Sequence, residues 1–291
     1  MTEADARRLT VCLSFDVDAM SGWINKTDNA AMISRGEFGA FAIPRILSLL
    51  DRHGAKATFF VPGHTALAYP ETVRSIAKAD HEIGHHGWVH ENPATFDRDG
   101  ENKILQRGID ALAEVAGVRP IGYRAPSGQF SPDTVDLLIK AGFRYESTLA
   151  ATDFWPYYVR NGDVVSKTEP FVFGEPSELI EIPIAWALDD FPLFELTPGS
   201  ASPQHTPSEV REIWQTEFDY AYANASGGVM TIIMHPQVIG RGSRLNMLDG
   251  LLEHMASHPG VVFESMETVE TRWRSENPLD AYLQNGGPLP R

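Results

Sequence analysis

Cysteine, basic residues and long apolar runs are all scarce in this sequence. The single cysteine, Cys12, cannot form a disulfide within the chain, and its place in an apolar run predicts a small buried side chain rather than a nucleophile. No stretch approaches the length of a membrane-spanning helix, and the first residues, MTEADARRLT, are too polar for a signal peptide. We therefore expect a cytoplasmic protein with no membrane partner.

The shortage of positive charge has its own consequence. The chain carries 24 lysines and arginines against 39 aspartates and glutamates, which gives a net charge of −15. This acidity disfavours binding to nucleic acid, so no nucleic-acid partner is expected. A hydrophobic content of 43% in 291 residues suits a globular enzyme with a sizeable core. We predict one α/β domain over residues 1–291.

Strand-like apolar runs alternate with amphipathic helices along most of the chain, as in parallel α/β folds. The strand-like runs begin near residues 9, 57, 81, 120, 144, 178, 228 and 261. Helices are expected over 43–54, 70–80, 99–117 and 131–143, and around the turn-spaced leucines after residue 247. Seven or eight strands with interleaved helices favour a closed or nearly closed barrel over an open sheet.

Three stretches interrupt this alternation, at residues 20–42, 152–177 and 189–206. Each is long for a connection and rich in aromatic residues or prolines. We expect these stretches to be loops that cover a site or a subunit interface.

Two aspartates, Asp16 and Asp18, stand at the end of the first strand-like run, LTVCLSFDVD. Side chains alternate between the two faces of a strand, so both carboxylates point to the same side. Like charges held this close resist ionisation unless a cation lies beside them. The pair therefore predicts a positively charged partner, and a solvated strand end is the alternative.

A histidine pair, His86 and His90, follows the third strand in GHHGWVHENP. Neutral imidazole is a good zinc ligand, and the HxxxH spacing lets both rings reach one ion. Asp18 would complete a site of two histidines and one carboxylate, which leaves Asp16 as the base for metal-bound water. A second pair with the same spacing, His254 and His258, is predicted to be solvated on the polar face of a helix.

Two further polar residues end apolar strands. Arg124 begins the stretch RAPSG, and His235 ends TIIMHP. The carboxyl ends of parallel strands converge on one face of a barrel, so these side chains are expected to meet the aspartates and the histidine pair. Taken singly, a surface ion pair for Arg124 and a hydrogen-bonded core position for His235 are the alternatives.

In combination, these motifs resemble the polysaccharide deacetylase family, the NodB-like metal hydrolases of carbohydrate esterase family 4, over about residues 9–270. The resemblance implies a distorted (β/α) barrel of seven or eight parallel strands. It also implies the site roles: Asp16 as the base, Asp18, His86 and His90 as metal ligands, Arg124 as the residue that orients the base, His235 as the acid, and Asp189 as the carboxylate that tunes His235. The choice between Asp189 and Asp190 stays open.

Two departures from the family pattern stand out. Val17 separates aspartates that are usually adjacent, and Gly87 stands where serine or threonine is usual. The chain thereby resembles an intracellular branch of the family, which is associated with cyclic imide hydrolysis, allantoinase-like ring opening and some peptidoglycan deacetylation. The resemblance also rests on the stretches FDVDAMSGW, ISRGEFG, DFWPYYVRNGD and WALDDFP. Several members of that branch are homotetramers, so the resemblance implies a homo-oligomer such as a tetramer.

The predicted activity is hydrolysis of a non-peptide carbon–nitrogen amide bond, of the N-deacetylase type, by metal-activated water. The metal and a backbone N–H near Ser127 would hold the oxyanion. The expected metal is Zn²⁺, with Co²⁺ or Ni²⁺ as alternatives, and the expected substrate is a saccharide or another small molecule. Ring opening of a cyclic imide or of allantoin is the alternative reaction, and a silent barrel that only binds a sugar is the competing class.

Overall fold

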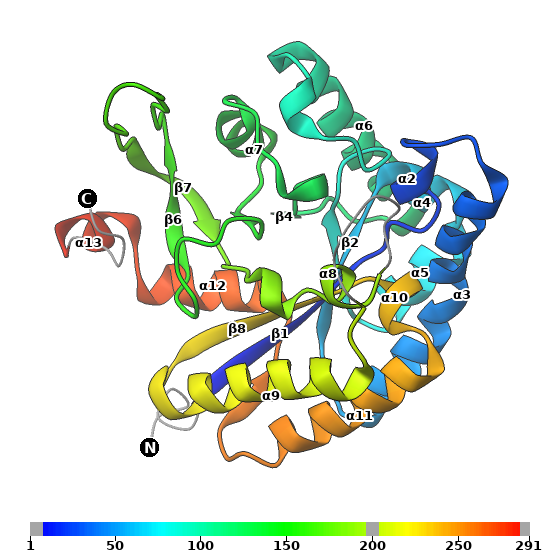
Figure 1. Cartoon of the computed structure of the whole chain (residues 1–291). Coiled ribbons are helices and arrows are strands. Elements are labelled where there is room, and N and C mark those ends of the chain that lie inside the picture. The colour runs from blue at the N-terminus through cyan, green and yellow to red at the C-terminus, as the bar shows by residue number, and fades with distance from the viewer. Residues whose placement is uncertain (1–7, 196–203, 286–291) are drawn as a thin grey trace.

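Nine strands form one curled sheet in the computed structural model, which describes residues 8–195 and 204–285 (Figure 1). The strands are β1 (Leu9–Asp16), β2 (Ala57–Val61), β3 (Glu82–His85), β4 (Gly122–Tyr123), β5 (Tyr145–Glu146), β6 (Tyr157–Asn161), β7 (Glu175–Glu181), β8 (Gly228–Met234) and β9 (Val261–Phe263). Their order is β6-β7-β5-β4-β3-β2-β1-β8, and β9 pairs with β1. All pairs are parallel except β6 with β7.

This curled half-barrel of parallel strands confirms the predicted α/β barrel-like fold. No ladder between the described residues joins β8 to β6 across the open side. On that side, β8 makes a single parallel bridge, between Ile233 and Asp189.

Strand β1 lies between β2 and β8 in the sheet and pairs with three strands. It pairs with β8 over seven residues on one side, and with β9 and then β2 on the other. Val11, Leu13 and Phe15 join the core beneath the outer helices, whereas Cys12 packs inside the curl of the sheet. The predicted alternation of faces and the burial of Cys12 are both confirmed.

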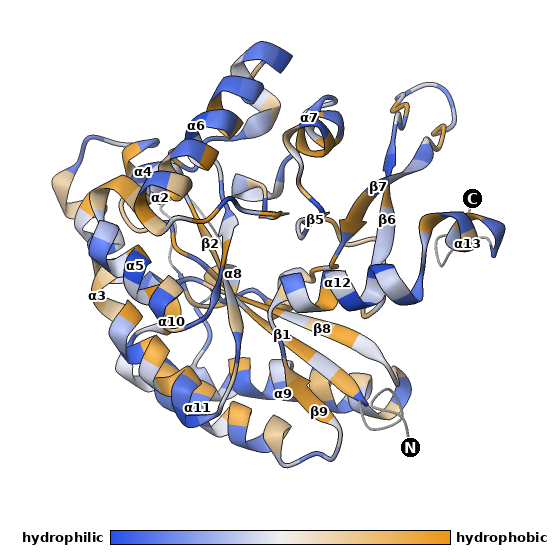
Figure 2. Cartoon of the chain, turned by 180° about the vertical axis from the view of Figure 1, so that it is seen from behind, coloured by the Kyte–Doolittle hydropathy of each residue, from blue (hydrophilic) through white to orange (hydrophobic). Residues whose placement is uncertain are grey.

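Most helices lie on the outside of the curled sheet, whereas α12 (Met266–Glu276) buries Met266 and Val269 with Cys12 on the inner side. Figure 2 shows that the neighbouring strands β1 and β8 are mostly apolar. The helices are α2 (Ser21–Ile24), α3 (Ala30–Arg52), α4 (Gly63–Ala68), α5 (Pro70–Lys78), α6 (Arg98–Ala116), α7 (Thr134–Ala141), α8 (Asp190–Phe194), α9 (Pro207–Asn224), α10 (Pro236–Ile239), α11 (Gly242–Ala256), α12 (Met266–Glu276) and α13 (Leu279–Gln284). Short 3₁₀ turns are η1 (Pro93–Thr95), η2 (Pro126–Gly128) and η3 (Trp186–Leu188). None of these helices combines the length and hydropathy needed to cross a bilayer.

Helix α3 begins 13 residues earlier than the sequence predicted, at Ala30 rather than at residue 43. Asn29 caps it by accepting a hydrogen bond from the backbone N–H of Ala31, at 3.0 Å. Pro44 lies inside the helix, although its position predicted a first turn. The expected loop over 20–42 is therefore mostly helix.

The second interrupting stretch, residues 152–177, contains β6 and the start of β7. These strands form an antiparallel hairpin at the edge of the sheet, with a register shift between Tyr158 and Arg160. The expectation of a loop holds for residues 152–156 and 162–174, and it missed the two strands, which are held by pairing within the sheet rather than by a strong local pattern. Of the third stretch, residues 196–203 lie outside the described part of the chain.

Candidate active site and metal centre

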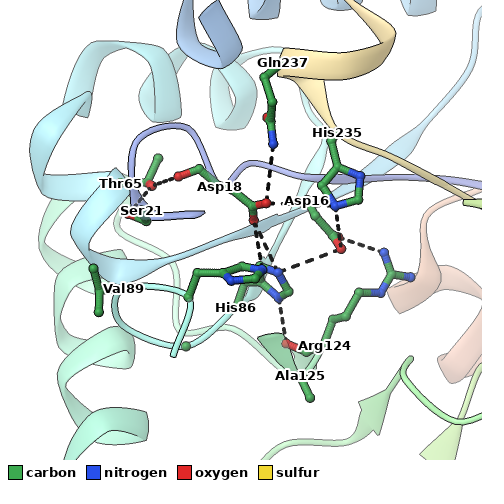
Figure 3. A network of polar contacts seen from close by, with 12 residues as sticks. Asp16, Asp18, Ser21, Thr65, His86, Val89, Arg124, Ala125, His235 and Gln237 are labelled. Carbon is green, nitrogen blue, oxygen red and sulfur yellow. Dashed lines mark hydrogen bonds and ion pairs between the residues drawn. The ribbon is translucent and has the colours of Figure 1, made fainter. Parts of the chain in front are cut away.

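The segments that follow β1, β3, β4 and β8 place polar side chains around one cavity at the carboxyl end of the sheet (Figure 3). The cavity has a volume of about 340 Å³. All of the predicted site residues line it: Asp16, Asp18, His86, His90, Arg124, Asp189 and His235. The structure therefore brings together residues that are up to 219 positions apart in the sequence.

Asp18, His86 and His90 form a compact group of metal-ligating side chains. The Oδ1 atom of Asp18 lies 3.4 Å from Nε2 of His86 and 3.7 Å from Nε2 of His90. His86 Nδ1 lies 2.8 Å from the carbonyl oxygen of Arg124, which can only accept, so this nitrogen donates and Nε2 keeps its lone pair. Asp18 Oδ1 and His86 Nε2 have no hydrogen-bond partner within the described chain, although both are buried. These orphaned atoms fit a divalent cation.

The charges at this group also favour a cation. Burial would raise the pKa of Asp18, but His90, His86 and His235 outweigh it and hold that pKa well below its usual range. Burial would lower the pKa of His86, yet Asp16 and Asp18 raise it. Burial lowers the pKa of His90 to about 4, which keeps the ring neutral, as ligation requires.

The turn that carries the histidine pair explains the glycine at position 87. Gly87 has a φ of +71°, and a Cβ atom there would lie 2.8 Å from Oε1 of Glu91 and from Cγ of Pro126. Glu91 in turn accepts hydrogen bonds from the backbone N–H groups of Trp88 and Val89, at 2.8 and 2.6 Å. A serine or threonine would clash with this arrangement, so the departure from the family pattern has a local steric cause.

Asp16 is held by Arg124. Its Oδ1 atom accepts a 2.8 Å hydrogen bond from Nη1 of Arg124, and its Oδ2 atom lies 3.8 Å from His86 Nε2 and 3.9 Å from His235 Nε2. Arg124 is itself fixed by hydrogen bonds to Ser14 Oγ and to both oxygens of Ser147, at 2.7 to 2.9 Å. One carboxylate oxygen is therefore occupied, and the other faces the cavity.

His235 is hydrogen-bonded to Asp190 rather than to Asp189, the residue that the resemblance suggested. Its Nδ1 atom lies 2.8 Å from Asp190 Oδ1 but 3.7 Å from Asp189 Oδ1. Asp189 instead caps α8 by accepting a 2.8 Å hydrogen bond from the backbone N–H of Phe191. Burial would lower the pKa of His235, but the hydrogen bond and charge of Asp190, with Asp189 and Asp18, raise it to about 10.

Sequence reasoning missed a layer of side chains around Asp18. Gln237 Nε2 lies 3.4 Å from Asp18 Oδ2, and Thr65 Oγ1 donates a 2.7 Å hydrogen bond to the Asp18 carbonyl. Ser21 Oγ lies 2.8 Å from the same Thr65 hydroxyl. Gln237 was detectable as a polar residue directly after the HP dipeptide, but Thr65 is brought to the site only by the packing of α4.

The rim of the cavity is largely aromatic. Trp23, Trp186 and Phe191 line it, together with Lys26. Trp186 leaves 58% of its surface exposed and lies across Gly128, where a Cβ atom would come within 3.2 Å of the indole ring. The exposed indole of Trp186 suits the apolar face of a small cyclic ligand.

Known proteins resemble this chain over nearly its whole length. The family model for polysaccharide deacetylase matches residues 9–146. A peptidoglycan deacetylase from Helicobacter pylori is 34% identical over 290 residues, which cover 94% of this chain and 99% of that protein.

Solved structures agree on the fold. A structure from Mycobacterium smegmatis assigned as a polysaccharide deacetylase is 35% identical, with a TM-score of 0.83 over 94% of this chain and 92% of that one. The structure of an allantoinase is 23% identical, with a TM-score of 0.78 over 94% of this chain and 92% of that one. At this identity the similarity shows a common fold alone. The chain therefore belongs to the polysaccharide deacetylase family and is a hydrolase of carbon–nitrogen bonds other than peptide bonds.

Proposed function

We propose that the protein is a metal-dependent N-deacetylase that hydrolyses the acetamido group of an N-acetylated amino sugar. One observation carries the proposal: a base candidate, Asp16, and an acid candidate, His235, face each other beside the Asp18, His86 and His90 group, with 3.9 Å between Asp16 Oδ2 and His235 Nε2. The name of the Helicobacter pylori relative, a peptidoglycan deacetylase, supports an amino-sugar substrate.

Asp18, His86 and His90 would hold the metal, and zinc suits two imidazoles and one carboxylate best. When bound, such an ion supplies a Lewis acid that polarises a carbonyl oxygen and lowers the pKa of water. Cobalt and nickel suit the same nitrogen-rich set.

Asp16 would act as the general base. Its Oδ2 atom faces the cavity and would take a proton from the attacking water, while Arg124 donates to Oδ1 and orients the carboxylate. Backbone N–H groups near Ser127, which lines the cavity, would donate to the oxygen that becomes negative as the carbonyl is attacked.

His235 would act as the general acid. Its Nε2 atom would donate a proton to the amide nitrogen as the carbon–nitrogen bond breaks, so that a neutral amine leaves and an acetate remains. An amide nitrogen is a poor leaving group until it is protonated, and the raised pKa of His235 keeps a proton available near neutral pH.

Ring opening of a cyclic imide or a related ureide is the second candidate. Two observations favour a small cyclic substrate. The fold is shared with an allantoinase, and the cavity of about 340 Å³ is at the small end of the range for ligand pockets, about 300–1,000 Å³. This reaction would use the same base and acid, because it also breaks an amide bond.

A parallel assay separates the two candidates. Zinc-loaded protein is offered chitooligosaccharides or peptidoglycan fragments with acetate release as the readout, and succinimide, hydantoin and allantoin with ring opening as the readout. Turnover of the cyclic compounds without acetate release would overturn the deacetylase proposal in favour of the second candidate. Light scattering on the same preparation checks the predicted homo-oligomer.

A further inference from the structure

A second cluster of metal-ligating side chains lies in the outer helical layer, outside the cavity. Asp219 belongs to α9, His254 lies in the last turn of α11, and His258 follows that helix. One ligand atom from each residue lies within 4.8 Å of the other two. Helices α9 and α11 run side by side (Figure 1), so the cluster joins two elements that are distant in sequence.

The orientation of the rings suits ligation. His254 Nε2 lies 2.8 Å from Asp219 Oδ1, and the two imidazole centroids are 4.8 Å apart. His258 Nδ1 lies 2.8 Å from the carbonyl oxygen of His254, so this nitrogen donates and Nε2 keeps its lone pair. Histidines that bind metals usually make this kind of second hydrogen bond, which fixes the ring.

Aromatic packing restricts the two rings further. The ring of Phe218, which is fully buried, meets both imidazoles edge-on, at 5.7 Å from His254 and 5.1 Å from His258. Tyr222 packs at 4.8 Å against His258. The pair is therefore partly buried rather than fully solvated as the sequence predicted: the side chain of His254 is 26% exposed.

We propose that Asp219, His254 and His258 form a second binding site for a zinc-like divalent cation, which clamps the end of α11 to α9. The ligands repeat the composition of the Asp18, His86 and His90 group: an HxxxH pair and one carboxylate from another element. Two imidazoles and a carboxylate are a ligand set that zinc accepts, and water would fill the remaining position because the site is open to solvent. The role is structural, and it does not depend on the proposed deacetylase activity.

Zinc titration of the chelator-treated protein, followed by calorimetry, tests the site. The His86→Ala/His90→Ala double variant removes two ligands of the cavity group and should still bind one zinc per chain. Adding His258→Ala or Asp219→Asn should weaken that binding at least tenfold. A matched control is His53→Ala. This variant removes a single histidine that pairs with an aspartate in the same way, with 2.6 Å between His53 Nε2 and Asp249 Oδ1. This control should leave binding unchanged.

A second measurement covers the case in which the double variant does not fold. Zinc should raise the melting temperature of otherwise wild-type His258→Ala protein less than that of wild type, because one of two stabilising ions is lost. Amide hydrolysis by His258→Ala should equal that of wild type. The proposal is overturned if a double variant that is folded binds no zinc, or if the zinc-dependent melting shift is the same with and without His258.

Discussion

Asp190 Oδ1 lies 2.8 Å from Nδ1 of His235 and also accepts the backbone N–H of that residue at 3.0 Å, so one carboxylate fixes both the ring and the backbone of the acid candidate. Asp189, one residue earlier, points to the start of α8 instead. Neighbouring aspartates of the same charge thus have different partners, and their removal should have different consequences.

We expect Asp190→Asn to impair amide substrates more than activated esters. The variant removes the hydrogen bond to the carboxylate and the charge of Asp190, the largest of the interactions that raise the pKa of His235, so the basic limb of the pH–rate profile on an anilide should move to lower pH. A nitrophenolate leaves without a proton, so the matched ester should lose less. The measurement is kcat/KM on both substrates across pH.

Asp189→Asn is the matched control for that experiment. Its carboxylate is 3.7 Å from His235, and its main contact caps α8, so the expected cost is at most about 1 kcal/mol of stability with a smaller change in the pH profile. Equal shifts of the profile in both variants would mean that the electrostatic field of the pair, and not the Asp190 hydrogen bond, sets the pKa of His235.

Asp16→Asn should retain its metal and lose most of its turnover. The substitution keeps size and shape but removes a base, and general base catalysis contributes about 10²–10⁴-fold. Zinc content by mass spectrometry and kcat are measured together, with Asp18→Asn for comparison. Loss of zinc from Asp16→Asn but not from Asp18→Asn would reverse the assignment of the two aspartates.

Chelator treatment should abolish hydrolysis, and zinc or cobalt should restore it. Asp18 Oδ1 and His86 Nε2 are buried without a hydrogen-bond partner in the part of the chain described, so the ion would satisfy atoms that otherwise carry a desolvation cost. Full turnover by protein verified as metal-free would rule out the metal-dependent reaction.

Gly87→Ala should disturb the metal group, whereas Gly117→Ala should not. Both glycines have a left-handed φ, +71° and +67°, so each substitution should destabilise the protein by about 1 kcal/mol or more. Only at Gly87 would the new methyl group meet Glu91 and Pro126, while nothing lies within 4 Å at Gly117. Zinc affinity should therefore fall in Gly87→Ala alone. A similar affinity in both variants would show that the turn can relax without moving the histidines.

Glu146→Gln should change how stability depends on pH. Burial raises the pKa of Glu146 to about 8 from 4.5, so the folded protein keeps this proton over a range where the unfolded chain has lost it. The contribution is fully present below pH 4.5 and is lost as pH rises through about 8, so the free energy of unfolding falls across that window.

The neutral glutamine should make this decline shallower, as measured by urea unfolding at pH 5 and pH 8. Glu178→Gln, at an exposed position of β7, is the control and should keep the wild-type slope. Identical slopes in wild type and Glu146→Gln would mean that other groups carry the pH dependence.

The ends of β1 and β8 were predictable from the sequence, because burial on both faces gives these strands mainly apolar runs, and polar residues, Asp16 and His235, mark where the runs end. The convergence of Asp16, Asp18, His86, His90, Arg124 and His235 on one cavity followed from parallel strand topology. The start of α3 was missed because Pro44 is a stronger local signal than the Asn29 cap, yet the helix continues through it.

The choice between Asp189 and Asp190 was beyond the sequence for a different reason. Both residues are aspartates at the start of a short helix, and either could serve as its cap. Tertiary structure determines which aspartate contacts His235. The bridge between Asp189 and Ile233 fixes how this segment aligns with β8, and Asp190 then faces His235. The same holds for Asp219, whose proximity to the second histidine pair depends on the packing of two separate helices.

The pairing of β1 with β8 has a consequence for how such enzymes diversify. Asp16, Asp18 and His235 stand at or just after the ends of these two neighbouring strands, which are bonded over seven residue pairs, whereas Trp23, Lys26 and Trp186 come from connecting segments. Natural variation can therefore lengthen or recompose the rim without altering the spacing between the proposed proton donor, His235, and the proposed proton acceptor, Asp16. Directed evolution toward new amides should accordingly concentrate its libraries on residues 23–29 and 184–188, and leave the two strands and the Asp189–Asp190 pair untouched.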